Sequence, residues 1–259
     1  MRITTFGDLI LDVIVHLDGP LVVDDDRPAE TLVGAGGQAA NTAAWAAAVG
    51  GHARFVGKRG ADPAGELAAG ELRRHGVDVC GPIAGRNGVV VSIAATGERS
   101  MASDRGSAPD LAPGELEAAW FDCDVLHISG YALAREPIAS AARRAAGLAR
   151  ELDARVTIDL SAWTLIDDDF RDRVRALAPD LVFANKAEYE TFGDLSTEWI
   201  VKRGPGGVVV AGHAYPAMPT DVVDTTGAGD AFAAGYLVGG VTTGLQTAAR
   251  CCAKLGAMP

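Results

Sequence analysis

The sequence has no long apolar run, no excess of positive charge and no Rossmann glycine motif. No stretch of about eighteen apolar residues is present, so we do not expect the chain to span a membrane. Its 259 residues carry a formal net charge of −11. Nucleic-acid binding usually needs a basic face, so this charge argues against a nucleic-acid partner. GDLILD replaces GxGxxG in the first βα unit, which disfavours a Rossmann dehydrogenase.

Cysteine motifs and targeting signals are lacking as well. The cysteines are Cys80, Cys123, Cys251 and Cys252. Their spacing fits no metal site and two are adjacent, so we expect reduced thiols rather than zinc ligands or disulfides. The amino-terminal stretch MRITTFGDLILDVIV alternates apolar residues with Asp8 and Asp12, which is not the layout of a signal peptide. We predict a cytoplasmic location.

What the sequence does contain is a regular alternation of strand-like and helical patterns. Short β-branched runs such as ITTF, VLHIS and RVTID are separated by helical periodicity. This alternation predicts an α/β fold, with a mostly parallel sheet and helices on both faces. No linker-like segment divides the chain, so a single domain over residues 1–259 is expected. The expected helices are residues 38–49, 62–75, 137–152 and 168–177, with further helices after 227.

Two stretches interrupt the alternation. Residues 10–23 and 88–102 have the pattern of hairpins, the second with a turn around Thr96-Gly97. They predict a small antiparallel sheet that forms a lid over a site. The alternative is that both are edge hairpins of the main sheet.

The stretch DTTGAGDAFAAGY, Asp224 to Tyr236, contains a glycine turn that leads into a helix. Residues Gly227, Ala228 and Gly229 allow a tight turn, and the helix that follows adds unpaired N–H groups and the positive end of its dipole. This combination predicts an anion pocket. Asp230 at its rim is a candidate general base that takes the proton of an attacking hydroxyl. The alternative is a carboxylate that only interacts with the helix dipole.

DTTGAGDAFAAGY resembles the carboxyl-terminal signature of the ribokinase-like carbohydrate kinases, the phosphofructokinase-B family. The resemblance implies a three-layer sandwich with a β lid, and an enzyme that uses ATP and Mg²⁺. It implies Asp230 as the base and residues 227–229 as the anion hole for the phosphoryl group.

A second stretch, VGAGGQAANTAAW, is similar to the amino-terminal signature of the same family. The resemblance places Gly36, Gly37 and Asn41 at the sugar, where glycines let the backbone approach and an amide supplies both donor and acceptor. Alone, the stretch could be a glycine-rich helix start. GDLILD is similar to the opening strand of the family and places Asp12 at the sugar hydroxyls.

The nucleotide side is implied by two further matches. NKAE resembles the Asn-x-x-Glu element, which implies that Asn185 and Glu188 organise Mg²⁺ through water. VKRGPGG is similar to the glycine turn near the nucleotide, with Gly204 and Gly207 at the expected spacing. Lys202 is then a candidate contact of the phosphates; an exposed lysine is the alternative.

The resemblance also implies a monovalent cation such as K⁺, held by carbonyl groups around Asp224 and Thr226. Outside these motifs, His127 is expected to be a packing or hydrogen-bonding histidine. Asp104 and Arg105 either touch the substrate or lie in a solvated loop.

The chain departs from the family in three places. Residues 189–201 are too few for the usual covering helix, and residues 211–220 leave little room for the nucleotide-side hairpin. The strand RVTIDLSAW carries Asp159 but lacks the Asp-x-Asn-x-Arg pattern. This lack makes fructokinase-like and ketodeoxygluconate kinase-like substrates less expected.

These motifs predict an ATP-dependent kinase that phosphorylates a hydroxymethyl group on a small sugar. One alternative is a nucleoside kinase of the same family, and another is a catalytically silent sugar or nucleotide sensor. Pairing of two lids through their unpaired edges would give a homodimer.

Overall fold

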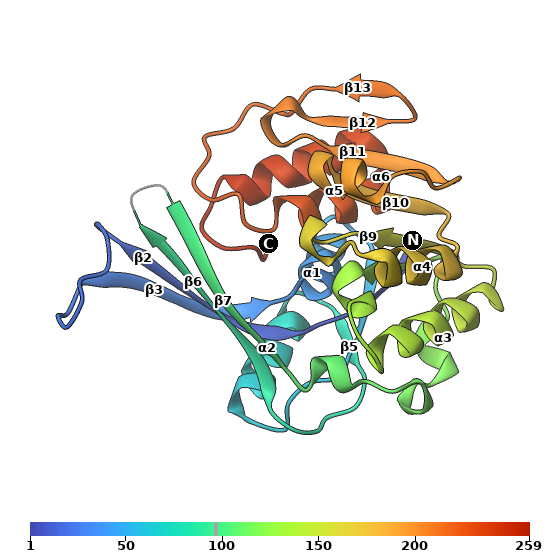
Figure 1. Cartoon of the computed structure of the whole chain (residues 1–259), viewed down its shortest axis with the longest axis horizontal. Coiled ribbons are helices and arrows are strands. Elements are labelled where there is room, and N and C mark those ends of the chain that lie inside the picture. Colours follow the sequence, from blue (N-terminus) through green and yellow to red (C-terminus); the bar gives the residue numbers. More distant parts are fainter. Residues whose placement is uncertain (96–97) are drawn as a thin grey trace.

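The central sheet of the computed structural model, which describes residues 1–95 and 98–259, is largely parallel (Figure 1). Seven neighbouring strands run parallel to one another, and two further strands add an antiparallel edge. In spatial order the strands are β13 (His213–Tyr215), β12 (Val208–Val210), β11 (Glu198–Lys202), β10 (Leu181–Asn185), β9 (Arg155–Asp159), β8 (Val125–Ser129), β1 (Arg2–Phe6), β4 (His52–Val56) and β5 (Asp78–Cys80).

Helices cover both faces of this sheet. One face packs against α1, α2 and α6, and the other against α3, α4 and α5, so two separate apolar clusters form. The predicted three-layer α/β arrangement is therefore confirmed. The helices are α1 (Gln38–Ala48), α2 (Pro63–Arg74), α3 (Ile138–Arg150), α4 (Asp168–Leu177), α5 (Lys186–Phe192) and α6 (Ala228–Cys252). None of the helices in the described residues is long and apolar enough to cross a membrane.

Local signals explain where these helices begin. The side chain of Asp62 accepts a hydrogen bond from the N–H of Gly65 at the start of α2, and Asp167 does the same for Phe170 in α4. Such caps stabilise a helix by about 1 kcal/mol each.

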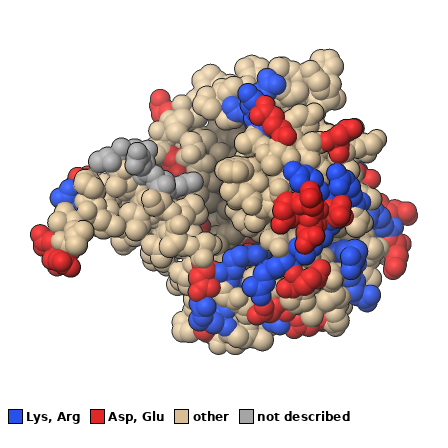
Figure 2. Space-filling view, in the orientation of Figure 1, with Lys and Arg blue, Asp and Glu red and all other residues tan. Residues whose placement is uncertain are grey.

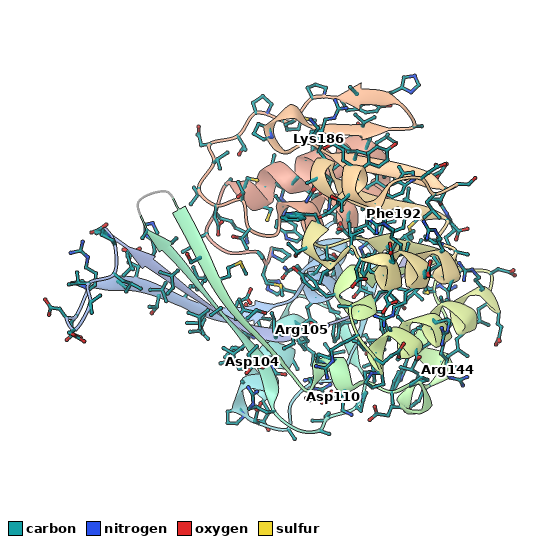
Figure 3. The ribbon with its side chains drawn as sticks, viewed as in Figure 1. Asp104, Arg105, Asp110, Arg144, Lys186 and Phe192 are labelled. Carbon is teal, nitrogen blue, oxygen red and sulfur yellow. The ribbon has the colours of Figure 1, made fainter. Side chains whose placement is uncertain are left out.

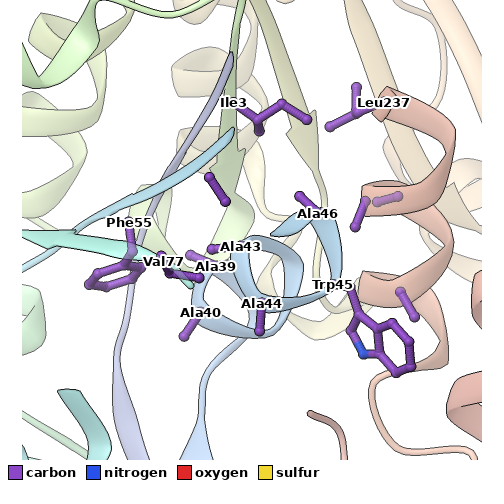
Figure 4. Close-up of a cluster of buried hydrophobic side chains, with 14 of the residues drawn as sticks. Ile3, Ala39, Ala40, Ala43, Ala44, Trp45, Ala46, Phe55, Val77 and Leu237 are labelled. Atoms are coloured by element: carbon purple, nitrogen blue, oxygen red, sulfur yellow. The ribbon is translucent and has the colours of Figure 1, made fainter. Parts of the chain in front are cut away.

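Helix α1 packs against both the sheet and its neighbour α6 and is built largely of alanine (Figure 4). The small side chains let it approach the sheet and α6 closely. Trp45, only 1% exposed, points toward α6, and its Nε1 donates to the carbonyl of Ala257 at 2.7 Å. Helix α1 is thereby tied to the carboxyl-terminal segment.

A second sheet projects from the main body as a lid (Figure 1). Its order is β3 (Ala29–Gly36), β2 (Ile10–Leu17), β6 (Asn87–Ala95) and β7 (Glu98–Gly106). Two antiparallel pairs form it, and their inner strands β2 and β6 run parallel to each other. It is a separate sheet, so the alternative of edge hairpins on the main sheet is wrong.

One predicted lid hairpin corresponds to an observed strand pair, which extends from residue 87 to residue 106, and the other does not. The hairpin at 88–102 corresponds to β6 and β7, and its predicted turn at Thr96-Gly97 lies outside the described residues. The stretch 10–23 is not a hairpin, because β2 pairs with residues 29–36. Residues 18–28 connect the strands, since their prolines and the run Asp24–Asp26 disfavour a strand.

The nucleotide-side hairpin is present although its segment is short. Strands β12 and β13 pair through a two-residue turn at Ala211-Gly212, and both turn residues have positive φ (48° and 80°). Such a turn needs little chain. The expectation that residues 211–220 leave little room for a hairpin is therefore wrong.

Candidate active site

The carboxyl ends of the parallel strands and the amino ends of two helices meet below the lid. Asp159, Asn185 and Lys202 are the last residues of β9, β10 and β11. Helices α1 and α6 begin at the same edge, and Figure 2 shows a hollow between the lid and the main body. In open α/β sheets this edge is where ligands bind.

Asp230 lies in the first turn of α6, where it meets α1. Asn41 Nδ2 donates a hydrogen bond to Asp230 Oδ2 at 2.8 Å, so helices distant in sequence share one polar contact. The pKa of Asp230 is raised to about 7, because burial and the nearby Asp159 carboxylate raise it by more than Asn41, Lys202 and Gln38 lower it. A carboxyl group with this pKa can accept a proton near neutral pH.

The turn before Asp230 requires glycine at its first position. Gly227 has φ 76°, and a Cβ there would lie 2.6 Å from the Cβ of Ala257. The Asp224 carboxylate fixes the loop, because its Oδ1 accepts from Thr226 N and Oγ1 and its Oδ2 from Gly256 N. The backbone N–H groups at the start of α6 are thus held in a rigid frame.

A buried ion pair lies under this turn. Lys202 Nζ pairs with the Asp159 carboxylate, with side chains 17% and 2% exposed. A Cβ built on Gly229 would be 3.2 Å from Lys202 Nζ, so the ammonium group packs against the turn at residues 227–229. Burial lowers the pKa of Lys202, but Asp159, Glu188 and Asp230 outweigh it and raise the pKa, which keeps the group charged. The alternative of an exposed lysine is wrong.

The predicted sugar-side residues come together at the base of the lid. A side chain at Gly36 would overlap the Asp12 carboxylate, and one at Gly37 would overlap the Asp8 carbonyl. Gly37 has φ 101° and caps α1, so Asn41 follows one turn later. Only glycine leaves room for these backbone and carboxylate positions.

Asn185 and Glu188 form a reciprocal cap at the start of α5. Glu188 N donates to Asn185 Oδ1, while Asn185 N and Nδ2 donate to the Glu188 carboxylate at 2.7 and 2.6 Å. Glu188 is 2% exposed, and burial raises its pKa. Both carboxylate oxygens are engaged, so this pair suits an ion contacted through water better than direct coordination.

The glycine turn at residues 204–207 closes the strand pair β11 and β12. Arg203 N donates to the carbonyl of Gly207 at 2.8 Å. Gly207 has φ 79°, and a Cβ there would overlap the carbonyl of Tyr215. Gly204 also has positive φ (55°) but has open space around it.

His127 lies in the core rather than in the site. It is fully buried, its Nδ1 is 2.8 Å from Thr157 Oγ1, and its ring packs edge-on against Phe183. Burial lowers its pKa to about 4. The predicted packing and hydrogen-bonding role is confirmed.

Arg105 and Asp104, at the inner end of β7, differ in their partners (Figure 3). Arg105 binds the Asp8 carboxylate with two nitrogens, at 2.5 and 2.9 Å, and donates to the Tyr131 carbonyl. Asp104 pairs with Arg86 at the surface. Arg105 therefore ties the lid to the end of β1, whereas Asp104 is solvated.

Sequence reasoning missed three residues of the site. Gln38 lowers the pKa of Asp230, Asp159 pairs with Lys202, and Ser161 donates to Gln38. The only signal for Asp159 was its place at the end of a buried strand. Gln38 gave a weaker signal, as the residue after the paired glycines.

An open groove of about 940 Å³ extends from this edge along α5. Residues 193–197 connect α5 to β11 without a helix, as the short segment 189–201 predicts. The groove is lined by Asn185 and Lys202 at one end and by Tyr189 and Trp199 further out.

A lidded α/β fold, with a glycine turn and a carboxylate at a helix start, defines a ribokinase-like kinase. The protein-family model described as "pfkB family carbohydrate kinase" matches residues 2–258, so the chain belongs to the PfkB family. It is an ATP-dependent carbohydrate kinase.

Curated relatives include sugar and sugar-phosphate kinases. A fructokinase of Escherichia coli is 29% identical, covering 95% of this chain and 86% of the relative. An ATP-dependent ribose-1-phosphate kinase of Halopiger xanaduensis is 30% identical, covering 94% and 86%. These relatives act on different substrates, so their likeness to the chain does not identify its sugar. That fructokinase-like substrates are less expected therefore stays a prediction.

Solved structures share the fold over nearly the whole chain. An adenosine kinase from Sinorhizobium meliloti has a TM-score of 0.86 and 26% identity, covering 100% of this chain and 95% of that chain. A putative ribokinase II from E. coli, in complex with ATP and Mg²⁺, has a TM-score of 0.84 and 20% identity, covering 99% and 94%. The latter likeness supports the fold alone.

Proposed function

We propose that this kinase transfers the γ-phosphoryl group of Mg·ATP to a hydroxymethyl group on a small sugar, with Asp230 as general base. The observation that carries the proposal is the position of Asp230, in the first turn of α6 and hydrogen-bonded to Asn41. Its pKa of about 7 leaves much of it ionised at neutral pH, yet basic enough to take a hydroxyl proton.

The anion turn stabilises the phosphoryl group during transfer. Backbone N–H groups of Gly227, Ala228 and Gly229 provide donors that need little reorganisation, and the helix dipole favours negative charge there. Lys202, held against Gly229, adds a fixed positive charge for the phosphates. Gly204 and Gly207 shape the turn at the nucleotide.

The sugar lies between the lid and α1 in this proposal. Asp12 accepts hydroxyl protons, Asn41 supplies an amide, and Gly36 and Gly37 let the backbone come close. The buried Asn41 Oδ1 has no hydrogen-bond partner among the described residues, so it is available to a substrate hydroxyl.

Asn185 and Glu188 would hold Mg²⁺ through its water shell. This fits their engaged carboxylate and amide atoms and the hydration that Mg²⁺ retains. The ion neutralises charge on the phosphates when bound.

K⁺ would bind carbonyl groups of the Asp224–Thr226 loop. The Thr226 carbonyl accepts a weak S–H donor from Cys251 at 3.2 Å, and a carbonyl oxygen has a second lone pair for a cation. Its effect would be to shape the anion turn.

A second candidate is a nucleoside acceptor. The adenosine kinase from S. meliloti, at 26% identity and a TM-score of 0.86, favours it. A nucleoside needs space for a base beside the ribose, so the size of the acceptor that turns over separates the two candidates.

We also propose that two copies of the chain associate through their lids, with the apolar outer face buried beside the unpaired strand edges. The strand register places Val13, Val33 and Val91 together on the face opposite Asp12. Val33 is 48% exposed, and burial of such an apolar sheet face stabilises association.

The test is ADP release with Mg·ATP across pentoses, hexoses, ketoses and nucleosides, with wild type and Asp230→Ala. We expect turnover with a sugar, and loss of turnover in Asp230→Ala while ATP still raises the melting temperature. Asp221→Ala, an exposed aspartate ahead of the loop, is the matched control. Near-normal activity in Asp230→Ala would mean that another group is the base.

A further inference from the structure

Gln38, the first residue of α1, is held by two serines. Its Oε1 accepts from Ser129 Oγ and from Ser161 Oγ, both at 2.5 Å. Ser129 ends β8, and Ser161 follows the end of β9 by two residues. Two strand ends therefore fix a single side-chain amide.

The other contacts of Ser161 indicate the direction of its hydroxyl group. Its Oγ accepts from Tyr131 N at 3.2 Å, and among the acceptors within reach of its hydrogen, Gln38 Oε1 at 2.5 Å is closer than the Asp159 carbonyl at 3.2 Å. Because Oε1 of Gln38 faces both serines, its NH₂ group faces the opposite way. Asp230 is hydrogen-bonded to Asn41, which lies one turn after Gln38 on the same side of α1, and Gln38 lowers the pKa of Asp230. An ionised carboxylate only accepts, so NH₂ is the end of the amide that suits it.

The backbone of Ser161 also indicates a constrained site. Its φ is 72°, in the left-handed region that a serine rarely adopts. The N–H of Ser161 donates to Asp159 Oδ1 at 3.1 Å, which holds this conformation. Such strain persists where the surrounding structure fixes it, and it concentrates at functional sites.

We propose that Gln38, oriented by Ser129 and Ser161, is a positioning residue for Asp230. Together with Asn41 it provides two amide donors, which aim the carboxylate and favour its ionised form. The inference rests on the proposed role of Asp230 as base, and it assigns a task to a residue that touches neither sugar nor nucleotide in that proposal.

Other groups around Asp230 also affect its charge. Asp159 raises the pKa of Asp230 and Lys202 lowers it. Tyr131 and Cys251 also interact with Asp230, but burial raises the pKa of Tyr131 above 10 and that of Cys251 to about 12, so both are neutral near pH 7. None of these groups changes when Gln38 is replaced.

The experiment is the pH profile of kcat for wild type and Gln38→Leu. Loss of a donor to the carboxylate raises the pKa of Asp230, so the acid limb should move up by about one pH unit. The rate should fall about tenfold below the limb and recover toward wild type near pH 9. Gln246→Leu, an exposed glutamine on α6, is the matched control and should leave the limb unchanged.

Ser161→Gly combined with Ser129→Ala tests the orientation without altering Gln38. Glycine accepts the positive φ, so this variant keeps the backbone and should shift the limb in the same direction, by less. It also decides the question if Gln38→Leu does not fold. An unmoved limb, or an equal loss at every pH, would overturn the inference.

A measurement that needs no turnover distinguishes a failure of this inference from a failure of the proposed function. The ¹³C signal of the Asp230 carboxyl, assigned by its loss in Asp230→Asn, reports its titration directly. A higher midpoint in Gln38→Leu supports the inference even if the base were another residue. Normal turnover of Asp230→Ala would contradict the proposed function instead, and an unchanged midpoint would contradict the inference alone.

Discussion

At the scale of single residues, the charge of Asp230 is set by opposing influences. Burial favours the neutral acid, while Lys202 and the amides of Asn41 and Gln38 favour the carboxylate. The balance leaves the pKa near neutrality, where small changes of environment alter the ionised fraction. The same cluster contains Asp159, whose charge is offset by Lys202.

This balance predicts the pH dependence of the reaction. Only the ionised form of Asp230 accepts a proton, so kcat should be half-maximal near pH 7 and fall about tenfold per unit below it. The measurement is kcat at saturating substrate and Mg·ATP between pH 5.5 and 9. A profile that stays flat down to pH 5.5 would contradict Asp230 as the titrating base.

Gly227 gives a second prediction at this scale. Gly227→Ala places a Cβ 2.6 Å from that of Ala257 at φ 76°, so the unfolding free energy should fall by about 1–3 kcal/mol. Displacement of the anion turn should reduce kcat by about 100-fold. Gly70→Ala is the control, because a Cβ at that helical position meets nothing within 4 Å beyond its chain neighbours and its own helix. Thermal unfolding and steady-state kinetics measure both effects, and equal behaviour of the two variants would contradict the steric argument.

At the scale of elements, α2 fixes the base of the lid. The carboxylate of Glu71 in α2 accepts from Ala35 N of the edge strand β3 at 2.7 Å. This contact positions the backbone just before Gly36 and Gly37. The bidentate pair of Arg105 with Asp8 fixes β7 in a similar way.

Removal of the hydrogen bond from Ala35 N to Glu71 should affect binding of the sugar more than binding of the nucleotide. We expect Glu71→Ala to raise the KM for sugar several-fold with little change in the KM for ATP, because a charge-assisted hydrogen bond of about 1.5–3 kcal/mol is lost. Glu66→Ala, an exposed glutamate of the same helix, is the control. Equal changes in both KM values would indicate general destabilisation rather than a local effect on the lid.

At the scale of the whole molecule, the lid presents one face to the site and another to solvent. Leu32 and Ile14 approach Gly256 near the carboxyl terminus, so that face of the lid packs toward the main body. The opposite face carries Val13, Val33 and Val91. That the chain is a single domain, and that it is cytoplasmic, stay predictions.

The proposed dimer can be tested on the outer face. Val33→Glu places a charge among apolar side chains, so light scattering coupled to size-exclusion chromatography should show a shift from dimer to monomer. Val23→Glu is the control, because Val23 is 86% exposed in the loop beyond the strands. A wild type that is monomeric at every concentration would contradict the lid dimer.

The sequence by itself determined the family, the order of elements and the two glycine motifs. These are local properties: the period of apolar residues specifies strand or helix, and a tight turn at an anion requires glycine at fixed spacing. Residues 227–230 and 36–41 could therefore be located without coordinates. The true partner of β2 could not, because strand pairing depends on residues 29–36, whose glycines also resemble a turn.

Tertiary structure alone decided which polar groups face one another. Asn41 and Asp230 are 189 residues apart, and Asp159 and Lys202 are 43 apart, yet each pair is in contact. Contacts of this kind depend on the strand order of the sheet, which brings the ends of β9 and β11 under the start of α6. The charge of Asp230, the burial of Lys202 and the proposed role of Gln38 follow from that packing, because desolvation and hydrogen bonding act through space rather than along the chain.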